Sequence, residues 1–212
     1  MRGIPVAKEG WPFILISLAP VIAAWLFGAW WIEFLLAPVF VFVVAFFRDP
    51  ERTVPDDENS IVSPADGRVI KIEKVFEGRL LKHDALKISI FMNVFNVHVN
   101  RAPASGRVAE ILYNPGKFFN ASLDKASMEN EQNALLLECG PSRRLMFNQI
   151  AGLIARRIVC RVKAGDSLKK GERFGMIRFG SRLDVYIPAT SRVNIKLNDK
   201  VKAGTSIVGY WT

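Results

Sequence analysis

The sequence predicts a mainly β fold of the α+β class: a barrel-sandwich, lipoyl-like β domain preceded by a hydrophobic helical hairpin. Three observations support this prediction. Apolar residues concentrate in the first 47 positions, short β-prone runs separated by glycine and proline turns follow from Ile61, and the C-terminal part contains an internal repeat. The chain has 212 residues, of which 50% are hydrophobic, which suits one domain of moderate size plus an apolar segment.

Residues 1–47 are predicted to form a membrane-associated helical hairpin. Two apolar runs, 11–27 and 29–47, meet near Gly28, and Glu33 is the one charged residue within them. Each run is near the lower limit of roughly 17–25 residues for crossing a bilayer, so the hairpin either spans the membrane or dips into it. The alternative is a buried hairpin of a soluble protein. Tryptophans near the bend favour the membrane, where such side chains anchor at the interface: Trp25, Trp30 and Trp31.

Basic residues flank the hairpin at both ends. Lys8 precedes it and Arg48 follows it. The positive-inside rule therefore places both ends, and the domain that follows, on the cytoplasmic side of the cell membrane. Residues 48–60 are polar, acidic and proline-containing, so we interpret them as a linker to a β-rich domain at 61–212.

Charge is distributed unevenly along the chain. Residues 141–212 carry 15 Lys and Arg against 4 Asp and Glu, whereas residues 1–140 carry 14 against 16. A basic C-terminal third suits an anionic partner, and the absence of a nucleic-acid motif favours a membrane surface over nucleic acid. A merely solvated basic surface is the alternative. The 2 cysteines and 2 histidines have no metal-ligand spacing, so we expect no metal site.

Several β-prone runs make up the predicted domain. Within one of them, Phe95–Asn100, apolar and polar residues alternate, which would place His98 between two amides on the polar face of a strand. A histidine in this position is a candidate functional residue, although a solvated imidazole is the simpler interpretation. The predicted strands are Val69–Val75, Leu86–Val99, Val108–Tyr113 and the hairpin Ala134–Cys139 with Arg144–Ile150.

An internal repeat occupies residues 162–175 and 195–209, about 33 residues apart. Each copy has a turn containing aspartate, a short apolar piece, a second glycine and a strand. Two copies are too few for a solenoid, so they predict pseudo-symmetric halves of one β-sandwich. The copies flank the pair Gly180-Ser181.

The pair Gly180-Ser181 stands at the entrance of a predicted half-buried strand, 183–187. Glycine leaves its own carbonyl open to attack, and the next residue carries a hydroxyl. That hydroxyl can attack the carbonyl, forming an ester by an N-to-O acyl shift, and elimination then breaks the chain. A strand entered through a glycine bend is the simpler interpretation of an arbitrary Gly-Ser pair.

Five stretches give the chain a resemblance to a known family. They follow one another in order and cover nearly the whole chain, so they are specific together although each is weak alone. The chain resembles the phosphatidylserine decarboxylase proenzymes, in particular their short bacterial form. The stretches are Phe46–Arg52, Ser63–Gly67, Asn96–Pro103, Asn120–Ser127 and Phe179–Ser181.

The resemblance implies an enzyme made by self-cleavage between Gly180 and Ser181. The products would be residues 1–180 and a small fragment, 181–212, that begins with a pyruvoyl group derived from Ser181. A protein-bound ketone of this kind accepts the electrons released by decarboxylation, as pyridoxal phosphate does elsewhere. The implied reaction converts phosphatidylserine in the membrane to phosphatidylethanolamine. The implied partners are the lipid and the cleaved small fragment, and a homo-oligomer stays open.

The resemblance also implies catalytic roles for Asp66 and His98 beside Ser181. Asp66 has no basic neighbour in sequence before Arg68, and we expect it to orient or assist the base that deprotonates Ser181. His98 is expected to return the proton during turnover. Longer relatives carry a second histidine where this chain has Arg101. The sequence therefore leaves open whether His98 serves both steps or Asp66 acts without a separate histidine.

A second class of function competes with the enzyme. The chain could be a non-enzymatic, membrane-anchored barrel-sandwich adaptor that binds anionic lipid or a partner protein, because a fold alone does not specify chemistry. The two classes differ in one simple property. A proenzyme yields two fragments, whereas an adaptor stays whole.

Overall fold

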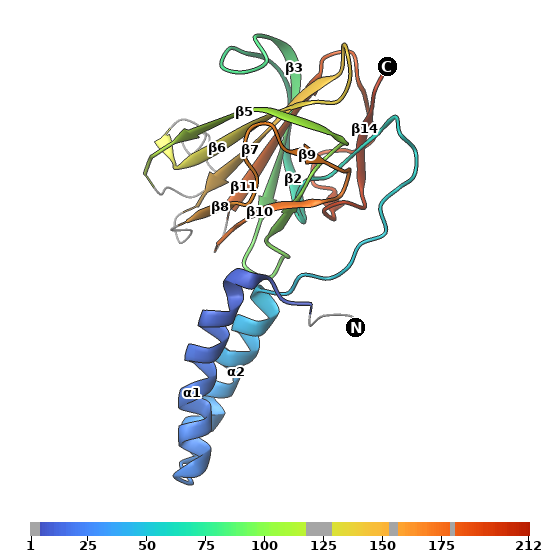
Figure 1. Cartoon of the computed structure of the whole chain (residues 1–212). Helices are drawn as coiled ribbons and strands as arrows, with labels where there is room; N and C mark the ends of the chain where they lie inside the picture. The colour runs from blue at the N-terminus through green and yellow to red at the C-terminus, as the bar shows by residue number, and fades with distance from the viewer. Residues whose placement is uncertain (1–4, 118–128, 153–156, 179–180) are drawn as a thin grey trace. The chain divides into compact units, whose positions relative to one another are not determined.

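A computed structural model of the chain describes residues 5–117, 129–152, 157–178 and 181–212. Contacts within the chain divide it into a helical unit that ends at Glu51 and a β unit from Arg52 to Thr212 (Figure 1). We describe the two units separately.

The helical unit is a hairpin, as predicted. A 3₁₀ turn, η1 (Lys8–Gly10), leads into α1 (Trp11–Leu26), and α2 (Trp30–Phe46) returns antiparallel to it. Gly28 lies in the turn with φ +67, a left-handed conformation that glycine adopts without strain. The open end is closed by a hydrogen bond of 2.8 Å from Ala7 N to Phe47 O.

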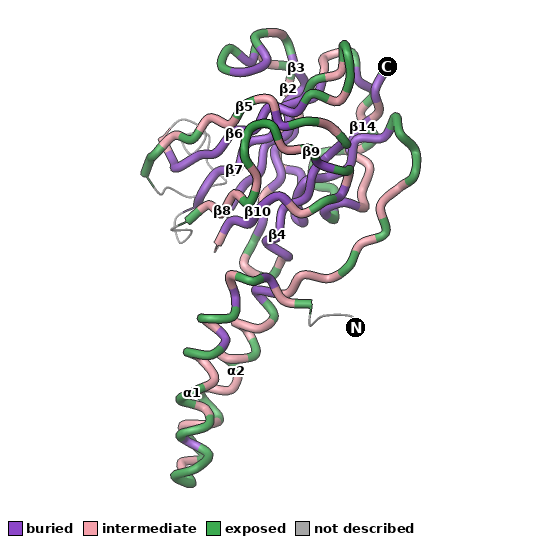
Figure 2. Tube along the Cα trace, viewed as in Figure 1, coloured by how far each residue is buried: buried purple, intermediate pink, exposed green. Residues whose placement is uncertain are grey.

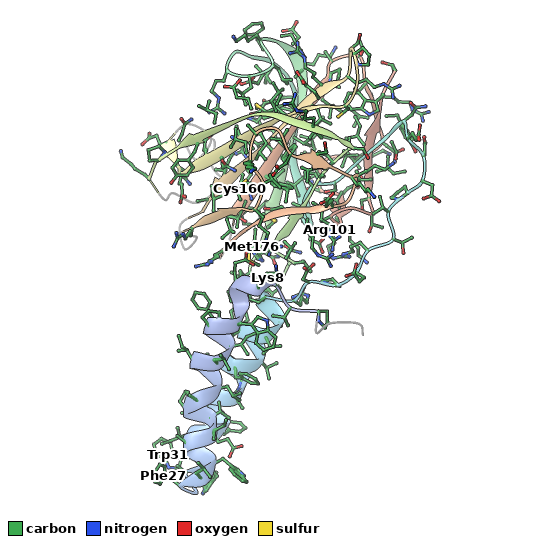
Figure 3. All side chains as sticks on the ribbon, viewed as in Figure 1. Lys8, Phe27, Trp31, Arg101, Cys160 and Met176 are labelled. Carbon is green, nitrogen blue, oxygen red and sulfur yellow. The ribbon has the colours of Figure 1, made fainter. Side chains whose placement is uncertain are left out.

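Most of this hairpin is exposed or half-buried (Figure 2), and many of its exposed residues are large and apolar. Trp25, Trp30 and Trp31 are 67%, 77% and 58% exposed on the hairpin. Figure 3 shows Phe27 and Trp31 at the turn and Lys8 at the opposite end. The helical segment Lys8–Leu26 is long and apolar enough to cross a membrane, whereas α2 is shorter.

The β unit contains one large sheet and two small ones. The large sheet has eight antiparallel strands, is curled, and has the order β13-β2-β3-β11-β7-β6-β5-β9 (Figure 1). The small sheets have the orders β1-β14-β12 and β4-β10-β8. The prediction of a mainly β fold with two N-terminal helices is thus confirmed. The strands are β1 (Ser60–Val62), β2 (Gly67–Glu77), β3 (His83–Met92), β4 (Val99–Arg101), β5 (Gly106–Asn114), β6 (Gln132–Glu138), β7 (Arg144–Ala151), β8 (Ile158–Cys160), β9 (Ser167–Leu168), β10 (Arg173–Ile177), β11 (Ser181–Pro188), β12 (Arg192–Val193), β13 (Lys200–Val201) and β14 (Ile207–Tyr210).

The pseudo-symmetry predicted from the repeat is present in the hydrogen bonds. Each half begins with a similar segment, Pro64–Val69 in one and Pro103–Val108 in the other. The residue two positions before each segment donates a backbone bond of 2.9 Å to the first residue of the other segment: Val62 N to Pro103 O, and Arg101 N to Pro64 O. Both following strands have a bulge at the same place, directly after Val69 in β2 and after Val108 in β5.

The two repeat loops make matching contacts with these segments. Val69 N bonds Asp199 O at 2.9 Å, and Val108 N bonds Asp166 O at 2.8 Å. The order of the large sheet is accordingly symmetric about its middle pair, β11 and β7. Each repeat loop therefore stabilises, through a backbone hydrogen bond, the turn that begins one half of the sheet.

The central strand β11 separates two environments. Its inward residues, among them Leu183, Val185 and Ile187, are fully buried in the main hydrophobic core. Its other face carries the ion pair of Arg182 and Asp184, also buried. Burial of both faces identifies β11 as the strand around which the unit is packed.

One predicted strand, Leu86–Val99, is wrong in its second half. The strand β3 ends at Met92, and a turn follows before β4 begins at Val99. Asparagine side chains form this turn: Asn96 Oδ1 accepts Asn93 N, and Asn93 Oδ1 accepts Phe95 N, both at 2.9 Å. Such bonds compete with a strand ladder and end the strand despite its alternating pattern.

Candidate active site

Ser181 is the first residue of β11 and lies between two neighbouring strands. It pairs with Met92 of β3 on one side and with Ala151 of β7 on the other. Its side chain is fully buried, and its Oγ has no hydrogen-bond partner among the residues that the structure describes. A buried hydroxyl without a partner is costly and needs an explanation. Ser89 and Ser191 share this property, but of the three only Ser181 directly follows a glycine in the sequence. Gly180, Phe179 and the stretch Asn120–Ser127 lie outside the described residues.

Buried amides surround the partner strands of Ser181. Asn100 of β4 donates to the Sδ of Met92 at 3.8 Å, and its Oδ1 accepts from Gln149 at 2.9 Å. Asn133 donates to Gln149 Oε1 at 3.1 Å. The network ties β4 to the face of the sheet that carries Ser181. Sequence analysis missed Gln149 and Asn133, although polar residues inside otherwise apolar strand runs were a usable signal.

His98 precedes β4 and is fully buried, so the prediction that it lies on the polar face of a strand is wrong. The asparagine turn replaces the predicted strand before β4, so the strand alternation does not set the direction of this ring. The Nδ1 of His98 lies 3.0 Å from Asn96 O. A carbonyl only accepts, so we assign the proton to Nδ1, which leaves Nε2 as the basic nitrogen of the neutral ring. The carbonyl of His98 accepts from Ile177 N at 3.3 Å, four residues before Ser181.

The Asp66 carboxylate is held by two partners. Oδ2 accepts from Arg52 Nη2 and Oδ1 from Ala203 N, both at 2.8 Å. The local sequence shows no basic neighbour of Asp66 before Arg68, and the structure adds Arg52, which reaches Asp66 from 14 residues upstream. Among the described residues, Asp66 and His98 share no hydrogen bond; each is oriented separately.

The turn that holds Asp66 still reaches the Ser181 end of the sheet. A Cβ on Gly67 would lie 2.3 Å from Phe91 O, so the backbone there packs directly against β3. Phe91 precedes Met92, the strand partner of Ser181. The structure therefore brings the Asp66 turn, the start of β4 and Ser181 to one end of β3 and β11.

Arg101 and His83, the other of the two histidines, lie elsewhere. Arg101, at the position of the second family histidine, donates to Gly171 O at 3.0 Å, and its Cδ packs near Gly204, so it contacts both repeat loops (Figure 3 labels Arg101). His83 pairs with Glu77 at the opposite end of β3.

The architecture and the site together define a class: a β protein with an apolar N-terminal hairpin and a buried serine hydroxyl at the start of its central strand. The sequence profile of the family described as "Phosphatidylserine decarboxylase" matches residues 39–209. Similar proteins named "Phosphatidylserine decarboxylase proenzyme" include those of three bacteria. They are those of Syntrophus aciditrophicus (51% identical, covering 96% of both chains), Aromatoleum aromaticum (52%, covering 96% of this chain and 94% of the relative) and Ralstonia nicotianae (49%, with the same coverages).

The chain belongs to the phosphatidylserine decarboxylase proenzyme family. The resemblance noted from five short stretches is thereby confirmed. Members of this family carry a pyruvoyl group made from a serine of their own chain.

Proposed function

We propose that the chain cleaves itself between residues 180 and 181 and then decarboxylates phosphatidylserine to phosphatidylethanolamine. One observation carries this proposal: the buried Oγ of Ser181, without a partner among the described residues, at the start of the central strand. Residues 1–180 and 181–212 would be the two fragments, and Ser181 the source of the pyruvoyl group.

In the proposed self-cleavage, Ser181 Oγ attacks the carbonyl carbon of residue 180. The new C–O bond forms as the C–N peptide bond breaks, the amide nitrogen takes the hydroxyl proton, and an ester results. Loss of the Cα proton of residue 181 then expels the carboxylate of residue 180. Water replaces the nitrogen of residue 181, which leaves as ammonia.

The buried setting of Ser181 fits the group that it would form. When present, a pyruvoyl group supplies an electron sink for the carbanion that decarboxylation creates. A site at the start of β11 is fixed by strand pairing on both sides and shielded from water, which favours a defined orientation of the reacting atoms.

His98 is proposed to handle the proton of turnover. The bond to Asn96 O fixes the orientation of its ring, and with the proton assigned to Nδ1, Nε2 is the nitrogen that can accept a proton. An imidazole can both take and give a proton near neutral pH. Asp66 is proposed to serve the self-cleavage step, acting from its own position because it is not bonded to His98 in the described structure.

The location proposed for the enzyme is the cytoplasmic face of the cell membrane. Lys8 and Arg48 flank the apolar hairpin, and the C-terminal third of the chain is basic. A membrane-resident substrate makes this location useful, because the lipid then need not leave the bilayer entirely. Within the same proposal, residues 61–212 form the catalytic domain, and the pseudo-symmetric halves support the barrel-sandwich description of its fold.

The experiment compares wild-type chain with Ser181→Ala, each purified in detergent and supplied with phosphatidylserine. The wild-type chain should separate into two fragments on a denaturing gel and release carbon dioxide. The variant should stay whole and inactive, because it lacks the nucleophile. A whole wild-type chain without activity would instead support the adaptor.

A further inference from the structure

We propose that Arg52 is a positioning residue for self-cleavage, because it holds the Asp66 carboxylate in the orientation that the reaction uses. This inference rests on the proposed function. It assigns a role to a residue that the sequence placed in a linker, outside the catalytic domain.

The contact between Arg52 and Asp66 is close and shielded from solvent. Nη2 of Arg52 lies 2.8 Å from Oδ2 of Asp66, and the two side chains are only 13% and 11% exposed. The other carboxylate oxygen is bonded to Ala203 N. With a separate donor on each oxygen, the plane of the carboxylate is fixed. Charge-assisted bonds of this kind are shorter and stronger than neutral ones.

The other pseudo-symmetric half of the β unit shows which feature of Asp66 is needed to hold a repeat loop and which is not. The residue equivalent to Asp66 is Ser105, which precedes Gly106 as Asp66 precedes Gly67. Ser105 Oγ accepts the backbone N of Lys170 at 2.9 Å, matching the bond from Ala203 N to Asp66 Oδ1. Fastening the repeat loop therefore needs only a neutral oxygen.

The negative charge and its arginine are the features that distinguish the half at the Ser181 end. A buried carboxylate needs compensation, so a residue with no task beyond holding the loop would be expected to stay neutral. Arg52 supplies the compensation and fixes the second oxygen. The charge on Asp66 thus has a purpose other than folding, and Arg52 serves that purpose through Asp66.

The position of Arg52 adds a consequence. It is the first residue of the β unit, where the chain enters from the apolar hairpin. Any displacement of the chain at residue 52 changes the contact with Asp66. Self-cleavage should therefore depend on a linker conformation that keeps Arg52 in contact with Asp66.

The test measures the rate of self-cleavage of full-length Arg52→Ala, starting from freshly synthesised precursor. We expect a rate about 10- to 100-fold lower, the scale of a lost charge-assisted bond. The matured fraction should decarboxylate at the wild-type rate per molecule. Arg68→Ala is the matched control, because it removes the same charge from an exposed residue that lies two positions from Asp66.

Two further measurements separate positioning from a general structural effect. Arg52→Lys should recover part of the rate. Guanidinium ion at a non-denaturing concentration should accelerate Arg52→Ala, whereas urea, a neutral molecule of the same shape, should not. Asp66→Ser combined with Arg52→Gln, which copies the neutral contact of Ser105 and leaves no unpaired charge, should keep the stability of the β unit and lose self-cleavage.

The outcomes are distinguishable. If the wild-type chain does not cleave, the proposed function fails. If the wild-type chain cleaves and Arg52→Ala cleaves at the same rate, or slows without any response to lysine or guanidinium, the role of Arg52 is overturned. If Arg52→Ala does not fold, Arg52→Gln with and without guanidinium gives the same decision.

Discussion

The buried ion pair on β11 gives a prediction whose size follows from the structure. Arg182 and Asp184 are bonded twice, Nε to Oδ1 at 2.6 Å and Nη2 to Oδ2 at 2.7 Å. Their side chains are 1% and 0% exposed. Lys87 lies 3.8 Å from the same carboxylate and also pairs with Glu73 at 3.3 Å. Asp184→Asn removes the charge that compensates Arg182 while the guanidinium stays buried.

We expect Asp184→Asn to lower the free energy of unfolding of the β unit by about 3–5 kcal/mol, the usual cost of breaking a buried pair from one side. With a urea dependence of roughly 1–3 kcal/mol per molar, the unfolding midpoint should fall by at least about 1 M. Circular dichroism in the Ser181→Ala background measures this without complication from cleavage.

The controls isolate the pair. Asp84→Asn makes the same charge change at an exposed position of β3 and should shift the free energy by no more than about 0.5 kcal/mol. Replacing both partners with apolar residues, Arg182→Met with Asp184→Leu, should recover most of the loss, because no unpaired charge stays buried. A loss under about 1 kcal/mol for Asp184→Asn, or a double variant less stable than the single one, would refute this reasoning.

Three more predictions follow from other parts of the molecule. Burial alone would raise the pKa of Glu77, but backbone N–H groups of residues 79–81 bond its carboxylate, and the pKa ends below its usual 4.5. Its stabilisation should be present above pH 4.5 and disappear as the pH falls through the lowered pKa; urea midpoints of Glu77→Gln should lack this dependence. His98→Ala should lower turnover per matured molecule by about 10²–10⁴-fold, measured as carbon dioxide released per cleaved chain. An unchanged rate would remove His98 from catalysis. Deleting residues 1–47 should shift the β unit from the membrane to the soluble fraction on centrifugation, and its retention in the membrane would show a second anchor.

The parts of the fold that depend on local pattern could be predicted from the sequence. The apolar runs and Gly28 specify the helical hairpin, and glycine-punctuated repeats predict the two-fold character of the β unit. The run 86–99 shows the limit of this approach. Its alternation is compatible with a strand, but the side-chain bonds of Asn93 and Asn96 stabilise a turn instead. The periodicity of apolar residues does not show whether side-chain hydrogen bonds will favour a turn over a strand.

The sequence proposes residues for the candidate site but does not give their contacts. Ser181, His98 and Asp66 were named from motifs, and motifs carry no distances. The bond between Arg52 and Asp66 joins positions 14 apart through a folded linker, and the amides Gln149 and Asn133 meet through sheet register. These contacts arise only when distant segments pack together. Nothing in the local sequence around Asp66 indicates that Arg52 is its partner.

The central claim is that Ser181 becomes the reactive end of a small fragment. The most direct measurement is the mass of both fragments under denaturing conditions, after the purified wild-type chain has matured. We predict a large fragment that ends at Gly180 with a free carboxylate, and a fragment 181–212 that is lighter by one ammonia than a peptide beginning with serine. An undivided chain that still decarboxylates phosphatidylserine, or a small fragment with an intact amino-terminal serine, would contradict the account.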